Sequence, residues 1–180
     1  LCVVTTDPIT GAESDIGTLA VHIACNDLAS SGAEPVGLMV TLLVPPGSGI
    51  DQIAEVMDQI KKEADLVNAD IIGGHTEVTD AVTRMVVSIT ALGRAKENRV
   101  VTTSGARPGD DIVMTKYAAA EGTAILANLL GDFLEARLGR ETVDRARRLI
   151  GSISVLKEGL IASENGASSM HDITEGGVLG

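Results

Sequence analysis

Residues 16–35 read IGTLAVHIACNDLASSGAEP, and this stretch decides how the chain folds. Apolar or small side chains occupy nearly every position from Leu19 to Leu28, so a helix here would have almost no polar face to turn toward water. Asp15 is expected to cap the beginning of this helix, and Gly32 is expected to end it. The sequence therefore predicts a buried helix.

Strands rich in Val and Ile are expected on both sides of this helix. They cover residues 1–6, 36–44 and 83–92. Asp7-Pro8 should end the first strand, because proline lacks the N–H that a sheet needs. Residues 50–67 carry apolar side chains at helical spacing and charges on the other side, which predicts a helix lying on the surface of a sheet.

A loop rich in Gly, Pro and Asp at residues 105–110 indicates a domain boundary. We therefore expect one domain over residues 1–105 and the first part of a second, truncated domain over residues 106–180. The second part should contain a strand and two helices, over residues 111–115, 121–130 and 141–163. This alternation of strands and helices predicts an α/β or α+β fold.

Composition argues against several classes of function. Hydrophobic residues make up 44% of the chain, but Tyr117 and Phe133 are its only aromatic residues, so it lacks stacking platforms for nucleic-acid bases. The net charge of −11 repels phosphate backbones, and a polyanion such as ATP would need a metal or local cations. No apolar run reaches the roughly 18–20 residues that span a bilayer, so we expect a cytoplasmic protein. Cys2 and Cys25 are interpreted as reduced packing residues.

Asn26 and Asp27 are polar residues inside the buried helix. A carboxylate there must be paired, hydrogen-bonded or bound to a metal, because burying it bare costs several kcal/mol. Asp7, at the end of the first strand, is its natural companion, since two carboxylates from separate elements suit Mg²⁺. A structural hydrogen bond for Asn26-Asp27 is an equal alternative, and Asp7 alone is more often a turn residue.

Residues 73–77, Gly-Gly-His-Thr-Glu, follow an expected strand. The two glycines would let the backbone approach a phosphate closely, and His75, Thr76 and Glu77 add a ligand, a hydroxyl and a carboxylate. Taken alone, a tight glycine turn with three solvated side chains is the simpler interpretation.

Lys116 follows the expected strand at residues 111–115, and Thr123 lies at the start of the next helix. Both a lysine at a strand end and a helix N-terminus can meet phosphate oxygens, although a lone lysine is more often simply exposed. Asp172 begins a further segment that combines an acidic group with glycines. Phosphate-loop, dinucleotide-binding and zinc signatures are missing from the sequence.

Four segments, taken in order, resemble the AIR synthase-related (PurM-like) superfamily. They are residues 5–8, 16–35, 73–76 and 172–177. The superfamily includes AIR synthase, thiamine-monophosphate kinase, selenophosphate synthetase and the hydrogenase maturation protein HypE, and HypE-like members resemble the chain best. The resemblance covers essentially the whole sequence.

The resemblance implies two α/β domains, with the N-terminal strands of two subunits joined in a barrel-like homodimer. It also implies ATP in a cleft, with Asp7 and Asp27 holding Mg²⁺. The residues expected at the nucleotide are Asn26, Gly73, Gly74, His75, Thr76, Lys116, Thr123 and Asp172. His75 stands where several members have an acid and Glu77 where HypE relatives have lysine, and these two are the candidate catalytic residues.

The implied activity is use of Mg-ATP to phosphorylate and activate a carbonyl-type oxygen. The substrate would be an unidentified small molecule or a protein-borne group, with hydrogenase maturation as the implied process. Two alternatives stay open: a small-molecule kinase like thiamine-monophosphate kinase, and a non-catalytic dimeric scaffold that binds nucleotide. Neither nucleic acid nor a membrane is an expected partner.

Overall fold

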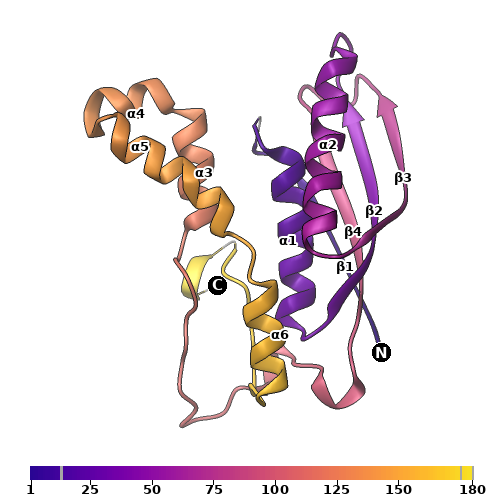
Figure 1. Cartoon of the computed structure of the whole chain (residues 1–180), viewed down its shortest axis with the longest axis vertical. Helices are drawn as coiled ribbons and strands as arrows, with labels where there is room; N and C mark the ends of the chain where they lie inside the picture. Colours follow the sequence, from indigo (N-terminus) through magenta and orange to yellow (C-terminus); the bar gives the residue numbers. More distant parts are fainter. Residues whose placement is uncertain (13, 175, 180) are drawn as a thin grey trace.

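The computed structural model describes residues 1–12, 14–174 and 176–179. A four-stranded sheet is covered on one face by two helices and is followed by a mainly helical C-terminal half (Figure 1). The strands are β1 (Cys2–Ile9), β2 (Glu34–Val44), β3 (Asp70–Val78) and β4 (Val86–Arg94). The two covering helices are α1 (Ile16–Ser30) and α2 (Ile50–Leu66). The mixed α/β fold predicted from the sequence is therefore confirmed.

The sheet has the strand order β1-β4-β2-β3. Strand β4 runs antiparallel to both β1 and β2, whereas β2 and β3 are parallel. Asp7, Ile89, Val40 and Gly74 pair in succession and form one row across the four strands. The sheet is open, with β1 and β3 at its edges, so a single chain does not close the barrel that the resemblance implies.

Helix α1 is the buried helix that the sequence predicts. Leu19, Val21, Cys25 and Leu28 are at most 1% exposed, because the sheet, α2 and a C-terminal helix surround α1. Asp15 precedes the helix but does not cap it, since its side chain makes no capping hydrogen bond. The expected cap is therefore wrong.

Strand β1 continues through Asp7-Pro8 to Ile9, beyond its expected end. An edge strand tolerates proline, because only one side of the strand needs hydrogen-bond donors. The expectation that both cysteines pack in the core is correct for Cys25 and wrong for Cys2, which is exposed at the start of β1.

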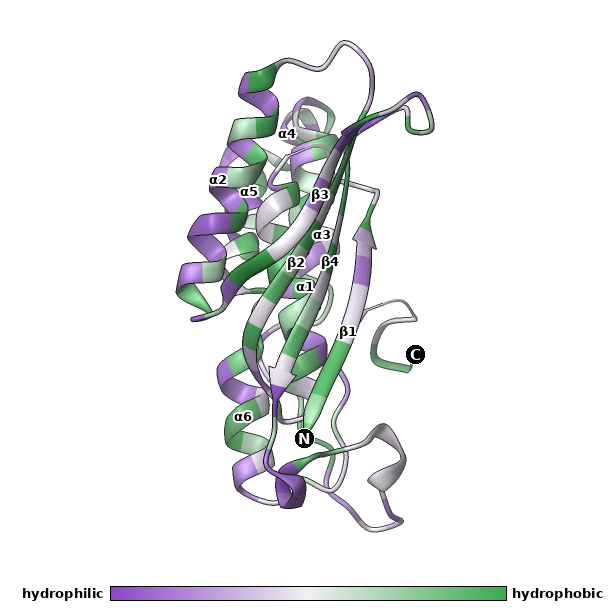
Figure 2. Cartoon of the chain, turned by 90° about the vertical axis from the view of Figure 1, so that its right-hand side faces the viewer, coloured by the Kyte–Doolittle hydropathy of each residue, from purple (hydrophilic) through white to green (hydrophobic). Residues whose placement is uncertain are grey.

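Side chains of the sheet alternate between a face that packs on the helices and an open face. In β2, Leu38, Val40 and Leu42 are buried against the helices, while Met39 on the other side is 46% exposed. Figure 2 views the sheet from its open side, with α1 behind the strands and α2 to their left. No helix of the described residues covers this face.

Gly73 and Gly74 lie inside β3 and not in a turn after a strand, which corrects the expected position. They pair with Met39 and Val40 of β2, next to a shift in register. A Cβ atom on Gly74 would lie 1.9 Å from the carbonyl oxygen of Val40, whereas one on Gly73 would meet nothing within 4 Å. Gly74 is therefore required by the close approach of β3 to β2.

The C-terminal half contains four α-helices within the described residues. They are α3 (Ala120–Leu129), α4 (Gly131–Leu138), α5 (Arg140–Arg147) and α6 (Leu156–Glu164). The expected strand at 111–115 does not form, and its Ile112 is 97% exposed. The expected helix at 141–163 is interrupted between Arg147 and Leu156. None of the described helices is both long and apolar enough to cross a membrane.

Helix α6 joins the C-terminal half to the core by packing directly on α1. The contact requires a glycine, because a Cβ atom on Gly159 would lie 2.5 Å from the carbonyl oxygen of Ala29. Just before α6, the side-chain Nδ2 of Asn26 donates to the carbonyl of Ile153 at 2.9 Å, and Asn26 Oδ1 accepts from the N–H of Val155 at 2.8 Å. These two bonds fix the connection between α5 and α6 against α1.

The two adjacent glycines of β3 allow a matched test of this packing. We expect Gly74→Ala to lower the free energy of unfolding by about 2 kcal/mol or more, because the new methyl group collides with backbone. Gly73→Ala should change it by less than about 1 kcal/mol. Urea unfolding with hydrogen exchange of the β3 amides measures both effects. Equal effects of the two substitutions would show that β3 does not approach β2 this closely.

Candidate functional site

Two carboxylates that the sequence analysis paired, Asp7 and Asp27, lie together in the structure. The Thr5 hydroxyl donates to Asp27 Oδ2 at 2.5 Å and lies 3.5 Å from Asp7 Oδ2. Thr5 and Asp7 come from β1, and Asp27 comes from α1, so the contact joins the sheet to the buried helix. The side chains of all three residues are partly buried.

Strand periodicity explains this meeting. Successive side chains of a strand point to opposite faces, so Thr5 and Asp7 share the face that packs on α1, while Thr6 lies on the open face beside Thr90. Helix α1 packs against β1 and β4 and carries Asp27 in its second half. The sequence pattern therefore places the β1 carboxylate on the helix side of the sheet.

A third carboxylate, Asp172, reaches the same place from the C-terminal segment. Its side chain is 11% exposed, and its Oδ2 atom is buried without a hydrogen-bond partner among the described residues. It interacts electrostatically with Asp27 and Asp7. Glu175, which the sequence analysis grouped with Asp172, lies outside the described residues.

Burial and acidic neighbours change the protonation of Asp7 and Asp172. Burial raises the pKa of Asp7 from 3.8 to about 6, with further increases from the hydrogen bond and negative charge of Asp27, while the Thr5 hydroxyl opposes the change. Burial, and then the charge of Asp27, raises the pKa of Asp172. Carboxylates that disfavour ionisation when no cation is present are typical of a site that gains stability by binding one.

The donor set of this site suits magnesium. Mg²⁺ prefers oxygen ligands and is usually held by one or two carboxylates, with waters and substrate phosphates completing its shell. Among residues 1–12, 14–174 and 176–179, no group of three or more His, Cys, Asp or Glu side chains is arranged to hold a metal by itself. Asp7 and Asp27, with the unpartnered oxygen of Asp172 nearby, fit a cation that shares its ligands with a phosphate.

Asn26 has a structural role in this geometry. Asn26 is only 8% exposed, and both polar atoms of its side chain form hydrogen bonds with the backbone just before α6. The structure thus favours the structural hydrogen bond over the expected contact with a nucleotide.

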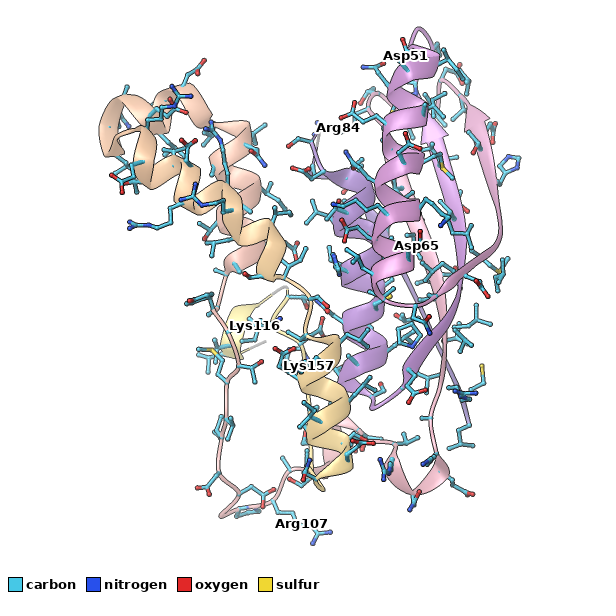
Figure 3. All side chains as sticks on the ribbon, in the orientation of Figure 1. Asp51, Asp65, Arg84, Arg107, Lys116 and Lys157 are labelled. Atoms are coloured by element: carbon cyan, nitrogen blue, oxygen red, sulfur yellow. The ribbon has the colours of Figure 1, made fainter. Side chains whose placement is uncertain are left out.

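Lys116 brings a cation close to the same connection. Its ammonium donates to the carbonyl of Ser154 and lies 3.3 Å from Glu158 Oε1 at the start of α6 (Figure 3). Lys116 also has a left-handed backbone, with φ of 55°. Its ammonium is therefore engaged with protein groups beside the connection that Asn26 holds on α1.

Thr123 is not brought to the carboxylates. It lies in the first turn of α3 with an exposed side chain, and no hydrogen bond of the described residues joins that side chain to Asp7, Asp27 or Asp172.

The glycine-containing strand lies at the opposite edge of the sheet from Asp7. Gly74 shares a row with Asp7 but is three strand spacings away, about 14 Å. His75 and Glu77 pair with Thr41 and Leu43 on the open face, where their side chains are 66% and 53% exposed and 3.6 Å apart between Nε2 and Oε2. Residues 73–77 are therefore not assembled with the acidic site in one chain.

A buried pair that was not predicted from the sequence joins α1 to α2. His22 Nε2 lies 3.0 Å from Glu63 Oε2 of α2, and burial lowers the pKa of His22. Glu63 belongs to the face of α2 that packs on α1, and a charged residue on an otherwise apolar face was the signal that would have revealed it. Thr5 belongs to the segment 5–8 that carries the resemblance but was not predicted as a site residue, although its position two residues before Asp7 places it on the same face.

The first half of the chain matches a known protein family. Residues 1–95 match the sequence profile of the AIR synthase related protein, N-terminal domain. These residues contain the whole sheet, α1, α2 and the two carboxylates Asp7 and Asp27.

Curated relatives match along nearly the whole chain. A putative hydrogenase expression/formation protein of Methanocaldococcus jannaschii is 29% identical over 97% of this chain and 50% of its own length. Carbamoyl dehydratase HypE of Rhizobium leguminosarum is 26% identical over 98% and 50%. Thiamine-monophosphate kinase of Methanospirillum hungatei is 29% identical over 89% and 49%. The chain thus spans about half the length of these relatives.

The crystal structure of hydrogenase maturation protein HypE in complex with ATP is 29% identical to this chain. It superposes with a TM-score of 0.66 over 73% of this chain and 41% of its own. With residues 1–95 matched to the family profile and relatives that extend beyond them, the chain belongs to the AIR synthase-related family.

Proposed function

We propose that the chain is part of an enzyme that uses Mg-ATP to phosphorylate and activate a carbonyl-type oxygen. The convergence of Asp7, Asp27 and Asp172, with the Oδ2 atom of Asp172 buried and without a hydrogen-bond partner among the described residues, carries this proposal. Its support from comparison is the likeness to HypE solved with ATP and to carbamoyl dehydratases.

Asp7 and Asp27 would hold the magnesium ion. When bound, the ion would neutralise phosphate charge and fix the orientation of the transferred group. The Thr5 hydroxyl donates a hydrogen bond to Asp27 and so keeps this carboxylate turned toward Asp7. Asp172 brings the C-terminal segment to the same place, and a cation bound there would favour the ionised form of its carboxyl group.

Lys116 would contact the phosphates after exchanging its present partners. Ser154 O and Glu158 hold the ammonium next to the connection that Asn26 fixes on α1. An anionic phosphate competes with a carboxylate for such a group, because both accept charged hydrogen bonds. Asn26 supports the site by holding this connection, and Thr123 remains a prediction from the sequence.

A homodimer would supply what one chain leaves apart. The open face carries apolar side chains such as Val4 (57% exposed) and Met39 (46%), and every residue of β3 is exposed. Packing two such sheets together would bury this surface and form the barrel implied by the resemblance. A second copy would then bring residues 73–76, which are Gly73, Gly74, His75 and Thr76, into contact with ATP. In that copy, His75 and Glu77 remain the candidate catalytic residues.

The division into domains at 105/106 is also a proposal. The sheet and its helices end with β4 at Arg94, and Ile112 and Val113 are extended, 97% and 81% exposed, and unpaired among the described strands. Exposed apolar residues in an extended segment favour a strand of a second sheet, to which residues 106–180 contribute only the first part.

The substrate would be a small molecule or a protein-borne group, and hydrogenase maturation in the cytoplasm is the expected setting. A small-molecule kinase is the alternative favoured by a specific observation, the 29% identity to a thiamine-monophosphate kinase. Product analysis distinguishes the two, because a kinase releases a phosphorylated product and a dehydratase releases phosphate. The non-catalytic scaffold predicts ATP binding without turnover.

The first test is magnesium-dependent ATP binding. Calorimetric titration of the full-length protein should give binding that requires Mg²⁺, and Asp27→Asn should weaken it by about tenfold or more, because a metal-ligating charge is lost. Asp51→Asn, on the exposed far end of α2, is the matched control and should bind like the parent (Figure 3).

Binding that is insensitive to Mg²⁺ or to Asp27→Asn would overturn the assignment of the metal ligands. Binding without any turnover of ATP, over a wide panel of acceptors, would favour the scaffold.

The raised pKa of Asp7 predicts a pH dependence of stability. The folded, metal-free protein holds the Asp7 proton more tightly than the unfolded chain, so this contribution is complete below about pH 4 and is lost as the pH rises through about 6. Asp7→Asn should therefore stabilise the metal-free protein near pH 7, on the order of 1 kcal/mol after solvent screening. The difference should vanish near pH 4.

Urea unfolding at several pH values in chelator measures this difference. Repeating it with Mg-ATP provides the control, since the parent should then be the more stable protein. A constant difference at every pH in chelator would contradict the origin of the effect in ionisation of Asp7.

A further inference from the structure

A cavity of about 290 Å³ lies between residues 11, 12 and 14 after β1, the beginning of α1, and α3. Leu19, Ile125 and Leu129 form much of its apolar wall, and Asp15 and Asn128 provide polar groups. It is separate from the carboxylate site, because Leu19 precedes Asp27 by eight residues of α1, about 12 Å along the helix. Clefts of this kind between structural units are common places for small ligands.

Asp15 is the acidic group among the described lining residues of this cavity. Its backbone is left-handed, with φ of 56°, and its side chain makes no capping bond to α1. The Oδ2 atom accepts one long hydrogen bond, of 3.4 Å, from Asn128 Nδ2. A carboxylate accepts about four hydrogen bonds, so Asp15 retains capacity for a donor.

The lining determines which ligand would suit the cavity. No Lys or Arg is among its described lining residues, so the carboxylate of Asp15 has no cation facing it there. A bound anion would be repelled, whereas an ammonium group would form a charged hydrogen bond with Asp15. The apolar wall of Leu19, Ile125 and Leu129 would receive a short hydrocarbon chain.

We propose that this cavity binds a small aliphatic ammonium compound, with its charged group on Asp15 and its chain against α1 and α3. A volume of about 290 Å³ corresponds to about ten water molecules, which restricts the ligand to about ten non-hydrogen atoms. The site is independent of the proposed use of ATP, since its residues do not overlap with Asp7, Asp27 or Asp172.

The test compares three probes of equal chain length. Titration of ¹⁵N-labelled protein with n-butylammonium chloride, n-butanol and sodium butyrate is followed by NMR at constant ionic strength. We expect saturable shifts only for n-butylammonium, at amides around Asp15 and Asn128. Asp15→Asn should weaken its binding about tenfold, because asparagine tolerates the left-handed backbone but carries no charge.

Two further variants make the result decisive. Asp132→Asn, on the exposed start of α4, removes an equal charge elsewhere and should bind like the parent. Leu129→Arg, at a position 57% exposed, would place a guanidinium beside Asp15 and should abolish binding without unfolding the protein. Equal binding of butanol, unchanged affinity in Asp15→Asn, or no saturable shift at these amides in the folded parent would each overturn the proposal.

Discussion

The burial of α1 on all sides is the constraint on which the rest of the structure depends. The sheet, α2 and α6 surround this helix, so each polar side chain on it must find a partner inside the protein. His22 meets Glu63 of α2, Asn26 meets the connection before α6, and Asp27 meets Thr5 of β1. The polar residues of one helix thus join its three neighbouring layers and determine where the carboxylate site lies.

The same constraint explains why acidic groups gather at this site. Both polar atoms of the Asn26 side chain have hydrogen-bond partners. Asp27 instead faces Asp7 and Asp172, and burial together with the negative charge of Asp27 raises the pKa values of these two residues. This clustering of carboxylates lowers the stability of the metal-free protein at neutral pH. A bound cation that carries its own anionic ligand would reduce the repulsion between them. The membership in the AIR synthase-related family and the likeness to an ATP-bound HypE structure point to the same chemistry.

The sheet presents a second constraint, because helices cover only one of its faces. Asp7 lies on the covered face at one edge, and His75 and Glu77 lie on the open face at the other edge. The resemblance places Asp7, His75 and Glu77 around one nucleotide, but in a single chain Asp7 is far from the other two. Association of two open faces is the proposal that reconciles the resemblance with this geometry.

The sequence by itself determined the buried helix, the amphipathic α2 and the pairing of Asp7 with Asp27, since these follow from periodicity and from the cost of burying a carboxylate. Only the tertiary structure decided that Gly73-Gly74 lies within an edge strand and that Asn26 holds the connection to α6. It also decided that residues 111–115 stay unpaired. Local sequence patterns indicate which secondary structure a segment favours. Strand order and hydrogen-bond partners depend on segments far away in the sequence.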